Sequence, residues 1–162
     1  MSTTTQGIDA RTSLAAWCGA VTGMTVADIK AIPADKWTSP FGGCTRPANA
    51  LLADTITMLV WTTAALKGET SDAYDKMEAL AGELVDQTAA ISAFTTASAA
   101  FGEALTSASE EFLQSSIMTP WQMPTPALMV AHIAVSHIWY HDGQFNYIQS
   151  LLGDEKVHWM GE

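Results

Sequence analysis

The sequence has little positive charge. Of its 162 residues only 7 are Lys or Arg, against 17 Asp and Glu, and the formal net charge is -10. No Lys or Arg occurs between Lys76 and Lys156. Such a surface repels phosphate backbones and anionic lipid heads, because the electrostatic attraction that drives binding to them has the wrong sign. We therefore expect no nucleic-acid or membrane partner, and the acidity is most simply explained by solubility.

Cysteines and long apolar runs are also scarce. The two cysteines, Cys18 and Cys44, show no CxxC spacing and are too few for a disulfide framework. The N-terminal stretch MSTTTQGIDAR has no basic segment followed by an apolar one, so no secretory signal is expected. No window holds about 18 consecutive apolar residues, so no membrane span is expected. These absences favour a cytoplasmic protein with reduced thiols.

What the sequence does contain is apolar residues at helical spacing. Hydrophobic residues make up 48% of the chain and charged residues 15%, which suits one all-α domain over residues 1–162. A shorter helix over 71–84 is expected to begin at Ser71. The periodicity and the separating Pro and Gly residues predict four long helices, over about 9–31, 45–68, 85–109 and 125–153. Long helices joined by loops predict a four-helix bundle, whose sites are built from inward-facing side chains.

Capping residues predict where two of these helices begin and end. The second helix is expected to begin at the N-cap Thr45 and to end at Gly68. The last helix is expected to begin at the N-cap Thr125, with Pro126 in the first helical position. Gly153 follows its last turn.

The last helix carries a candidate metal site. Each residue advances about 100° around a helix, so His137 and His141 lie about 40° apart and can converge on one ion. Gln144 joins the same stripe, which Ile133 and Ile148 continue with apolar side chains. Buried imidazoles need partners, and a divalent ion would satisfy both. The alternative is two ordinary histidines bonded to Ser, Thr or water. The chain lacks HExxH, so a metalloprotease is not supported.

Other potential ligands are less well placed. His132 lies five residues before His137, about 140° away around the helix, so it is not expected to join the site. His158 follows the last helix and is expected at the surface. Cys44 precedes the second helix, and it can be a fourth ligand, a reactive thiol or an ordinary free cysteine.

The third ligand is expected from the second helix. Asp54 is the only acid between Arg46 and Lys67, and it lies on an otherwise apolar line of that helix. A buried carboxylate without a partner is costly, whereas one bound to a cation opposite two histidines is satisfied. The alternative is a carboxylate that faces solvent or hydrogen-bonds to Trp, Thr or Arg.

The sequence resembles the DinB/YfiT-like proteins. Their last-helix signature is HxxxH, a variable residue and Gly-Gln, matched here by His137, His141, Gly143 and Gln144. The stretch TPWQMPTPALMVAHI, with its aromatic turn and Thr-Pro, is similar to the approach to that helix. The segment RPANALLADTITMLVWTTAALKGE, with its Leu-x-Gly ending, is similar to the second helix of the family.

The resemblance implies a DinB-like four-helix bundle with one divalent metal, usually held by three histidines. Two of these match His137 and His141, while Asp54 stands where the family has its first histidine. A two-histidine, one-carboxylate set suits Zn or Ni, and also Fe or Mn. Characterised relatives include thiol-dependent transferases and a maleylpyruvate isomerase, so the implied partner is a low-molecular-weight thiol. Gln144 and Tyr140 are then candidate supporting groups, and a homodimer is compatible with the family.

Two further functions stay open. One is a non-catalytic bundle, in which the polar stripe is structural or binds metal without chemistry. The other is a metal-free bundle that binds a small molecule in a pocket lined by aromatic residues, although aromatics at helical spacing usually belong to the core. The six tryptophans that could line it are Trp17, Trp37, Trp61, Trp121, Trp139 and Trp159.

Overall fold

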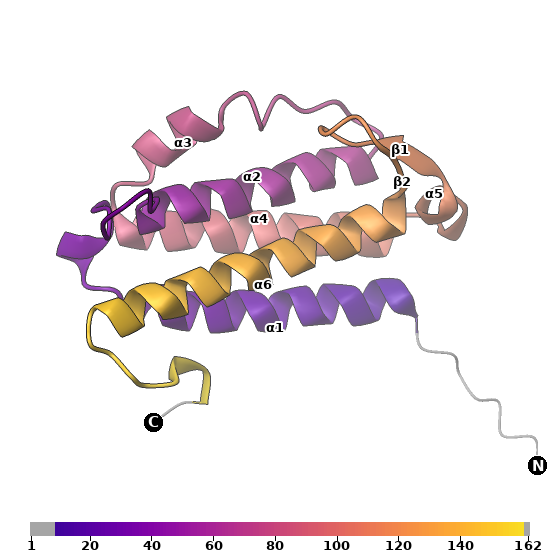
Figure 1. The fold of residues 1–162 in the computed structure, drawn as a ribbon. Helices are drawn as coiled ribbons and strands as arrows, with labels where there is room; N and C mark the ends of the chain where they lie inside the picture. Colours follow the sequence, from indigo (N-terminus) through magenta and orange to yellow (C-terminus); the bar gives the residue numbers. More distant parts are fainter. Residues whose placement is uncertain (1–8, 161–162) are drawn as a thin grey trace, which may run out of the picture.

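Four long helices lie side by side in the computed structural model, which describes residues 9–160 (Figure 1). Residues 1–8, most of the stretch considered for a secretory signal, lie outside the described part. The long helices are α1 (Ala10–Ala31), α2 (Ala48–Leu66), α4 (Gln87–Ser107) and α6 (Ala127–Leu151). Helices α1 and α2 each pack against both α4 and α6. The shorter elements are η1 (Ala34–Lys36), α3 (Met77–Glu83), α5 (Glu110–Gln114), β1 (Ser116–Met118), β2 (Pro124–Pro126) and η2 (His158–Met160).

The prediction of a predominantly helical chain is confirmed, and α1 and α2 lie close to their predicted ranges. Asp9 caps α1, because its side chain accepts a hydrogen bond from the Arg11 amide. Helix α2 begins three residues later than predicted. The predicted cap, Thr45, is used in the preceding turn, where its hydroxyl donates to the Gly42 carbonyl and accepts from the Phe41 amide. The end of α2 is as expected, with Gly68 at a φ of 72°.

The predicted start of the short helix is wrong. Helix α3 begins at Met77 instead of Ser71, whose hydroxyl accepts from the Ala73 amide in a turn. Helix α4 begins after Asp86, whose carboxylate accepts from the Ala89 amide. Local side-chain bonds of this kind compete with the helix ladder and decide where it starts.

A small hairpin precedes α6 and corrects the predicted start of that helix. Strands β1 and β2 pair antiparallel, with Thr125 opposite Ile117. Thr125 is therefore a strand residue and not the N-cap, and Pro126 is the cap instead of the first helical residue. Two prolines in a three-residue edge strand are tolerated because their missing N–H groups can face away from the partner strand.

The core lies between the long helices. Its largest fully buried aromatic side chains are Trp37, Phe94, Phe101 and Phe145. By length and composition alone α2 could cross a membrane, but 67% of its most apolar window is buried inside the molecule. A core helix of a soluble protein has the same character, so this is weak evidence for a membrane span.

A buried polar cluster joins α1 to α6. Asp28 and Asp142 are almost fully buried, and Asp28 accepts hydrogen bonds from Asn146, Gln149 and the Trp159 indole. Burial, followed by the neighbouring Asp28 carboxyl group, raises the pKa of Asp142 well above its usual range. Asp142 therefore keeps its proton to a higher pH than an ordinary aspartate does.

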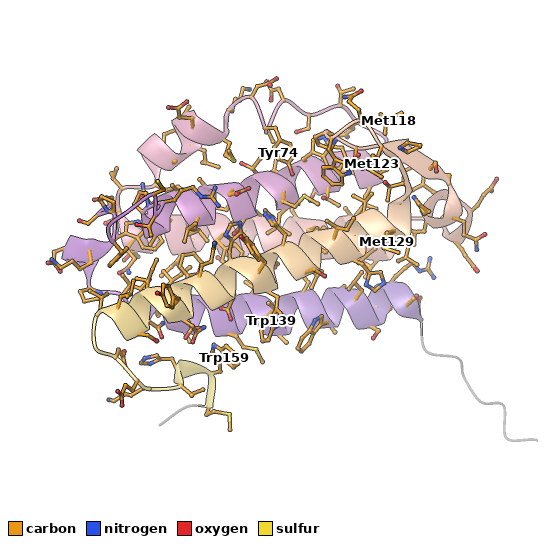
Figure 2. The ribbon with its side chains drawn as sticks, in the orientation of Figure 1. Tyr74, Met118, Met123, Met129, Trp139 and Trp159 are labelled. Atoms are coloured by element: carbon orange, nitrogen blue, oxygen red, sulfur yellow. The ribbon has the colours of Figure 1, made fainter. Side chains whose placement is uncertain are left out.

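The indole of Trp159 also belongs to a row of aromatic rings. Its ring centroid lies 5.3 Å from that of Trp139, which lies 5.9 Å from that of Trp17. Figure 2 shows Trp159, in the C-terminal segment, beside Trp139 of α6. Trp37 is in the core, Trp61 packs on Tyr74 and Trp121 is exposed. The six tryptophans are thus spread over the molecule, which gives no support to a common aromatic pocket.

Trp37 should be a sensitive point of the core. Its indole N–H donates to the Leu84 carbonyl over 2.8 Å, in a fully buried environment. We expect Trp37→Phe to lower the free energy of unfolding by about 2 kcal/mol or more, because the carbonyl loses its donor and volume is lost. Urea unfolding measures this. Trp121→Phe, at an exposed position, should change stability by less than about 0.5 kcal/mol. An equal effect of the two substitutions would contradict the assignment.

Asp142 should make stability fall as pH rises. Its pKa is higher in the folded than in the unfolded chain, so above the unfolded value near 3.8 the folded state holds a proton that the unfolded state has released. We expect Asp142→Asn, which mimics the protonated acid, to reduce this slope and to stabilise the protein at pH 8 by about 1 kcal/mol or more. Urea unfolding from pH 4 to 8 tests this, with Glu155→Gln as an exposed control. A steeper fall in the Asn variant would refute the assignment.

Candidate metal centre

Helices α2 and α6 bring Asp54, His137 and His141 together. Asp54 lies near the middle of α2, and the two histidines lie one turn apart on α6, which packs against α2. Among the described residues, these three form a group whose ligand atoms all lie within 4.8 Å of one another. The two histidine Nε2 atoms are 3.1 Å apart. The carboxylate oxygens lie 3.4 Å from His141 Nε2 and 3.7 Å from His137 Nε2.

These spacings suit a metal ion. Two ligand atoms each about 2.0–2.1 Å from a tetrahedral ion lie about 3.3 Å from each other. The three measured separations, 3.1, 3.4 and 3.7 Å, bracket that value. The donor set of two imidazoles and one carboxylate is typical of sites for Zn and other divalent transition metals. The group could therefore hold one divalent ion without a change of backbone.

The site is enclosed on one side and open on the other. His141 is fully buried, whereas the side chains of His137 and Asp54 are 25% and 18% exposed. If these three side chains held an ion, they would leave a coordination position free, as in catalytic rather than structural zinc sites. The exposed edge means that a small molecule can reach this position from solvent.

Gln144 sets the tautomer of His141. The Nδ1 atom of the ring lies 2.6 Å from the Gln144 side-chain oxygen, which can only accept, so Nδ1 carries the proton. The Nε2 atom then presents a bare lone pair to Asp54 and His137. Metal-bound histidines commonly donate their other N–H to such an acceptor. Gln144 also donates weakly to the Tyr140 hydroxyl over 3.4 Å.

His137 is held in its neutral form. Burial, with a further contribution from His141, lowers the pKa of His137. A neutral imidazole is the form that binds metals. Its Nδ1 atom is buried and has no hydrogen-bond partner among residues 9–160. The ring is flanked by Tyr140, which stacks on it at an interplanar angle of 4°.

Asp54 is ionised although it is largely buried. Burial by itself would raise its pKa, but its contacts with His141 and with the Arg46 guanidinium outweigh this and lower the pKa below its usual range. The Arg46 guanidinium donates to Oδ2 over 2.8 Å. Asp54 therefore makes the hydrogen bond to Arg that the sequence left open as an alternative, and it also belongs to the group with His137 and His141. Lone pairs from a carboxylate and two imidazoles converge, and only a proton or a cation between them relieves their repulsion.

Tyr74 closes the same region from the segment before α3. Its hydroxyl donates to the Met58 sulfur over 3.0 Å, and burial, followed by the negative charge of Asp54, raises its pKa to about 12. Figure 2 shows Tyr74 in the chain that passes over α2. The phenol therefore stays protonated near the carboxylate.

The other predicted residues lie outside the cluster. His132 is exposed, in keeping with its exclusion by helical angle. His158 is half-buried and pairs with Asp154 over 2.8 Å, so it is less exposed than expected. Cys44 is a free, exposed cysteine and is absent from the group of potential ligands, so the structure gives no support to a fourth ligand there.

Two residues near the site were not singled out from the sequence. Arg46 lies eight residues before Asp54, outside the helix, and only the bend of the chain at Pro47 brings it back to the carboxylate. Tyr74 comes from a loop whose path no local pattern describes. The one available signal was the isolated acid itself, because a buried carboxylate requires a positive partner.

A groove of about 400 Å³ lies beside the centre, between the loop before α2 and the end of α6. Its lining includes Arg46 and Gln144, the residues that hydrogen-bond Asp54 and His141. The remaining walls are mainly apolar or uncharged. The groove therefore gives a ligand a place next to the three converging side chains.

Comparison with solved structures finds a similar helical fold. One matching structure is that of a mycothiol-dependent maleylpyruvate isomerase, with a TM-score of 0.67 and 14% sequence identity. The match covers 83% of this chain and 59% of that chain, so the chain spans less than two thirds of the isomerase. No family model and no curated protein matches the sequence. The resemblance is thus supported at the level of the fold.

Proposed function

We propose that this chain is a DinB/YfiT-like four-helix bundle enzyme that binds one divalent transition metal and uses a low-molecular-weight thiol. Asp54, His137 and His141 would be the ligands, and Zn or Ni the preferred metals, with Fe or Mn as alternatives. The observation that carries the proposal is that one carboxylate and two imidazoles converge, with their ligand atoms at distances that suit one shared ion. The reaction class is a thiol-dependent transfer or isomerisation, as the name of the structurally similar isomerase suggests.

The residues of the chain have separate roles in this proposal. When bound, a divalent ion lowers the pKa of a thiol or water that it holds. Gln144 keeps His141 in the tautomer that offers Nε2. Arg46 holds the Asp54 carboxylate from the solvent side. Tyr140 covers both rings, because it stacks on His137 and meets His141 edge-on.

The setting of the enzyme is also part of the proposal. We place it in the cytoplasm as a single domain over residues 1–162, on the strength of its two unpaired cysteines and its acidic surface. A homodimer would use an uncharged face, and α1 offers one, since no charged residue lies between Arg11 and Asp28. The alternative is a bundle that binds metal or a small molecule without catalysis.

Metal content tests the ligand set. We expect purified or reconstituted protein to carry about one divalent ion per chain and His141→Ala to lose it, because a ligand is removed. Gln144→Leu should retain the site but weaken metal affinity about 10–100-fold, because the histidine loses its orienting acceptor. His132→Ala is the matched control, with a histidine removed from the exposed side of α6. Elemental analysis after reconstitution with Zn, Ni or Mn measures this. Wild-type protein that takes up none of these metals would sink the proposal.

Thiol binding separates the enzyme from a metal-binding bundle. The protein loaded with Co(II) should change its visible absorption when mycothiol, glutathione or cysteine is added, because sulfur enters the open coordination position. The change should be absent with the corresponding S-methyl compound. A spectrum that stays constant with every thiol, in protein that holds one Co(II), would favour the non-catalytic bundle.

A further inference from the structure

The groove beside the metal centre has an unusual charge for this protein. Its polar lining consists of Cys44, Thr45, Arg46, Gln144 and Tyr147, and no acidic side chain among residues 9–160 lines it. The chain as a whole has 17 acids against 7 bases. Within the part of the chain that the structure describes, Arg46 is therefore the one charged side chain that lines the groove, in a chain whose net charge is -10.

Most N–H groups of the Arg46 guanidinium make no hydrogen bond to another residue in the part of the chain that the structure describes. A guanidinium offers five N–H groups, and within residues 9–160 this one makes a single hydrogen bond, from Nη1 to Asp54. Its side chain is 43% exposed and lines the groove. Arg11 differs, because its Nε, Nη1 and Nη2 atoms all bind acceptors, on Asp9 and the Ala108 carbonyl. Both arginines hold a nearby aspartate, but the pairing of Arg46 leaves most of its donors available.

Apolar side chains surround the Arg46 guanidinium in the groove. Its apolar lining residues are Phe41, Leu51, Ile148 and Leu151. One guanidinium among apolar side chains matches a monoanion with a small apolar body. A carboxylate meets the planar fork of arginine with two parallel hydrogen bonds, which gives both affinity and orientation.

We propose that Arg46 and this groove form a subsite for the carboxylate of the substrate, with its apolar part along Leu51, Ile148 and Leu151. The inference rests on the proposed function, since it names the class of substrate brought to that metal centre. Arg46 would hold the Asp54 ligand with one edge and the substrate carboxylate with the other. It is therefore a positioning and specificity-determining residue.

The test uses 3-phenylpropionate and its uncharged amide, 3-phenylpropionamide, as probes. Calorimetry on Zn-reconstituted protein should show the acid binding at least about 10-fold more tightly than the amide, as expected for hydrogen bonds to a charged group. Arg46→Met should abolish this preference, and Arg46→Lys should retain part of it, since a lysine keeps the charge but loses the fork. Arg11→Met, which removes the other aspartate-paired arginine, should leave the preference unchanged.

Metal content measured on each sample separates the two proposals. Equal binding of acid and amide by metal-loaded wild-type protein would overturn the subsite alone. Wild-type protein that takes up no metal but still prefers the acid through Arg46 would count against the metal enzyme and leave the subsite standing. If Arg46→Met also loses metal, both proteins are compared after chelation, and a preference that persists in the variant overturns the inference.

Discussion

The carboxylate of Asp54 is the constraint on which the site depends. It lies within the most apolar helix of the molecule, where an ionised group without partners is costly. Arg46 meets it from the loop before α2, and the two histidines meet it from α6. The loop, α2 and α6 are thus held around one negative charge. The groove follows from this, because it is the space between the loop and the end of α6 that the pairing defines.

Asp142, which is buried together with Asp28, is in a different environment although it is the sequence neighbour of His141. Asp54 faces a guanidinium and imidazoles, and its pKa is lowered, whereas Asp142 faces Asp28 and its pKa is raised, first of all by burial. Adjacent residues on α6 therefore point to two polar clusters of opposite character. The cluster at Asp28 ties α1, α6 and Trp159 together and is structural. The cluster at Asp54 has converging lone pairs, which is what a cation requires.

Much of this could be predicted from the sequence, for identifiable reasons. Helix ranges follow from apolar periodicity, and the site follows from the four-residue spacing of His137 and His141 together with the isolated acid in α2. The starts of helices were less predictable, because Thr45 and Ser71 bind local backbone groups in turns instead of capping. The hairpin was missed because prolines argue against strands. Arg46 and Tyr74 were missed because loop paths, which depend on the packed whole, decide where they lie.

The aspartate also bears on how this chain departs from the family that it resembles. That resemblance implies a neutral histidine at position 54, and a carboxylate there adds a negative charge to the ligand set. Arg46 supplies a positive charge 2.8 Å from the same carboxylate. The Asp54–Arg46 pair is therefore neutral as a unit, as an imidazole would be, so the Lewis acidity of a bound ion need not fall as it would with an unpaired carboxylate. On this argument the two positions act as one functional unit, and a neutral residue at 46 would change the electronic character of the centre even where all three ligands remain.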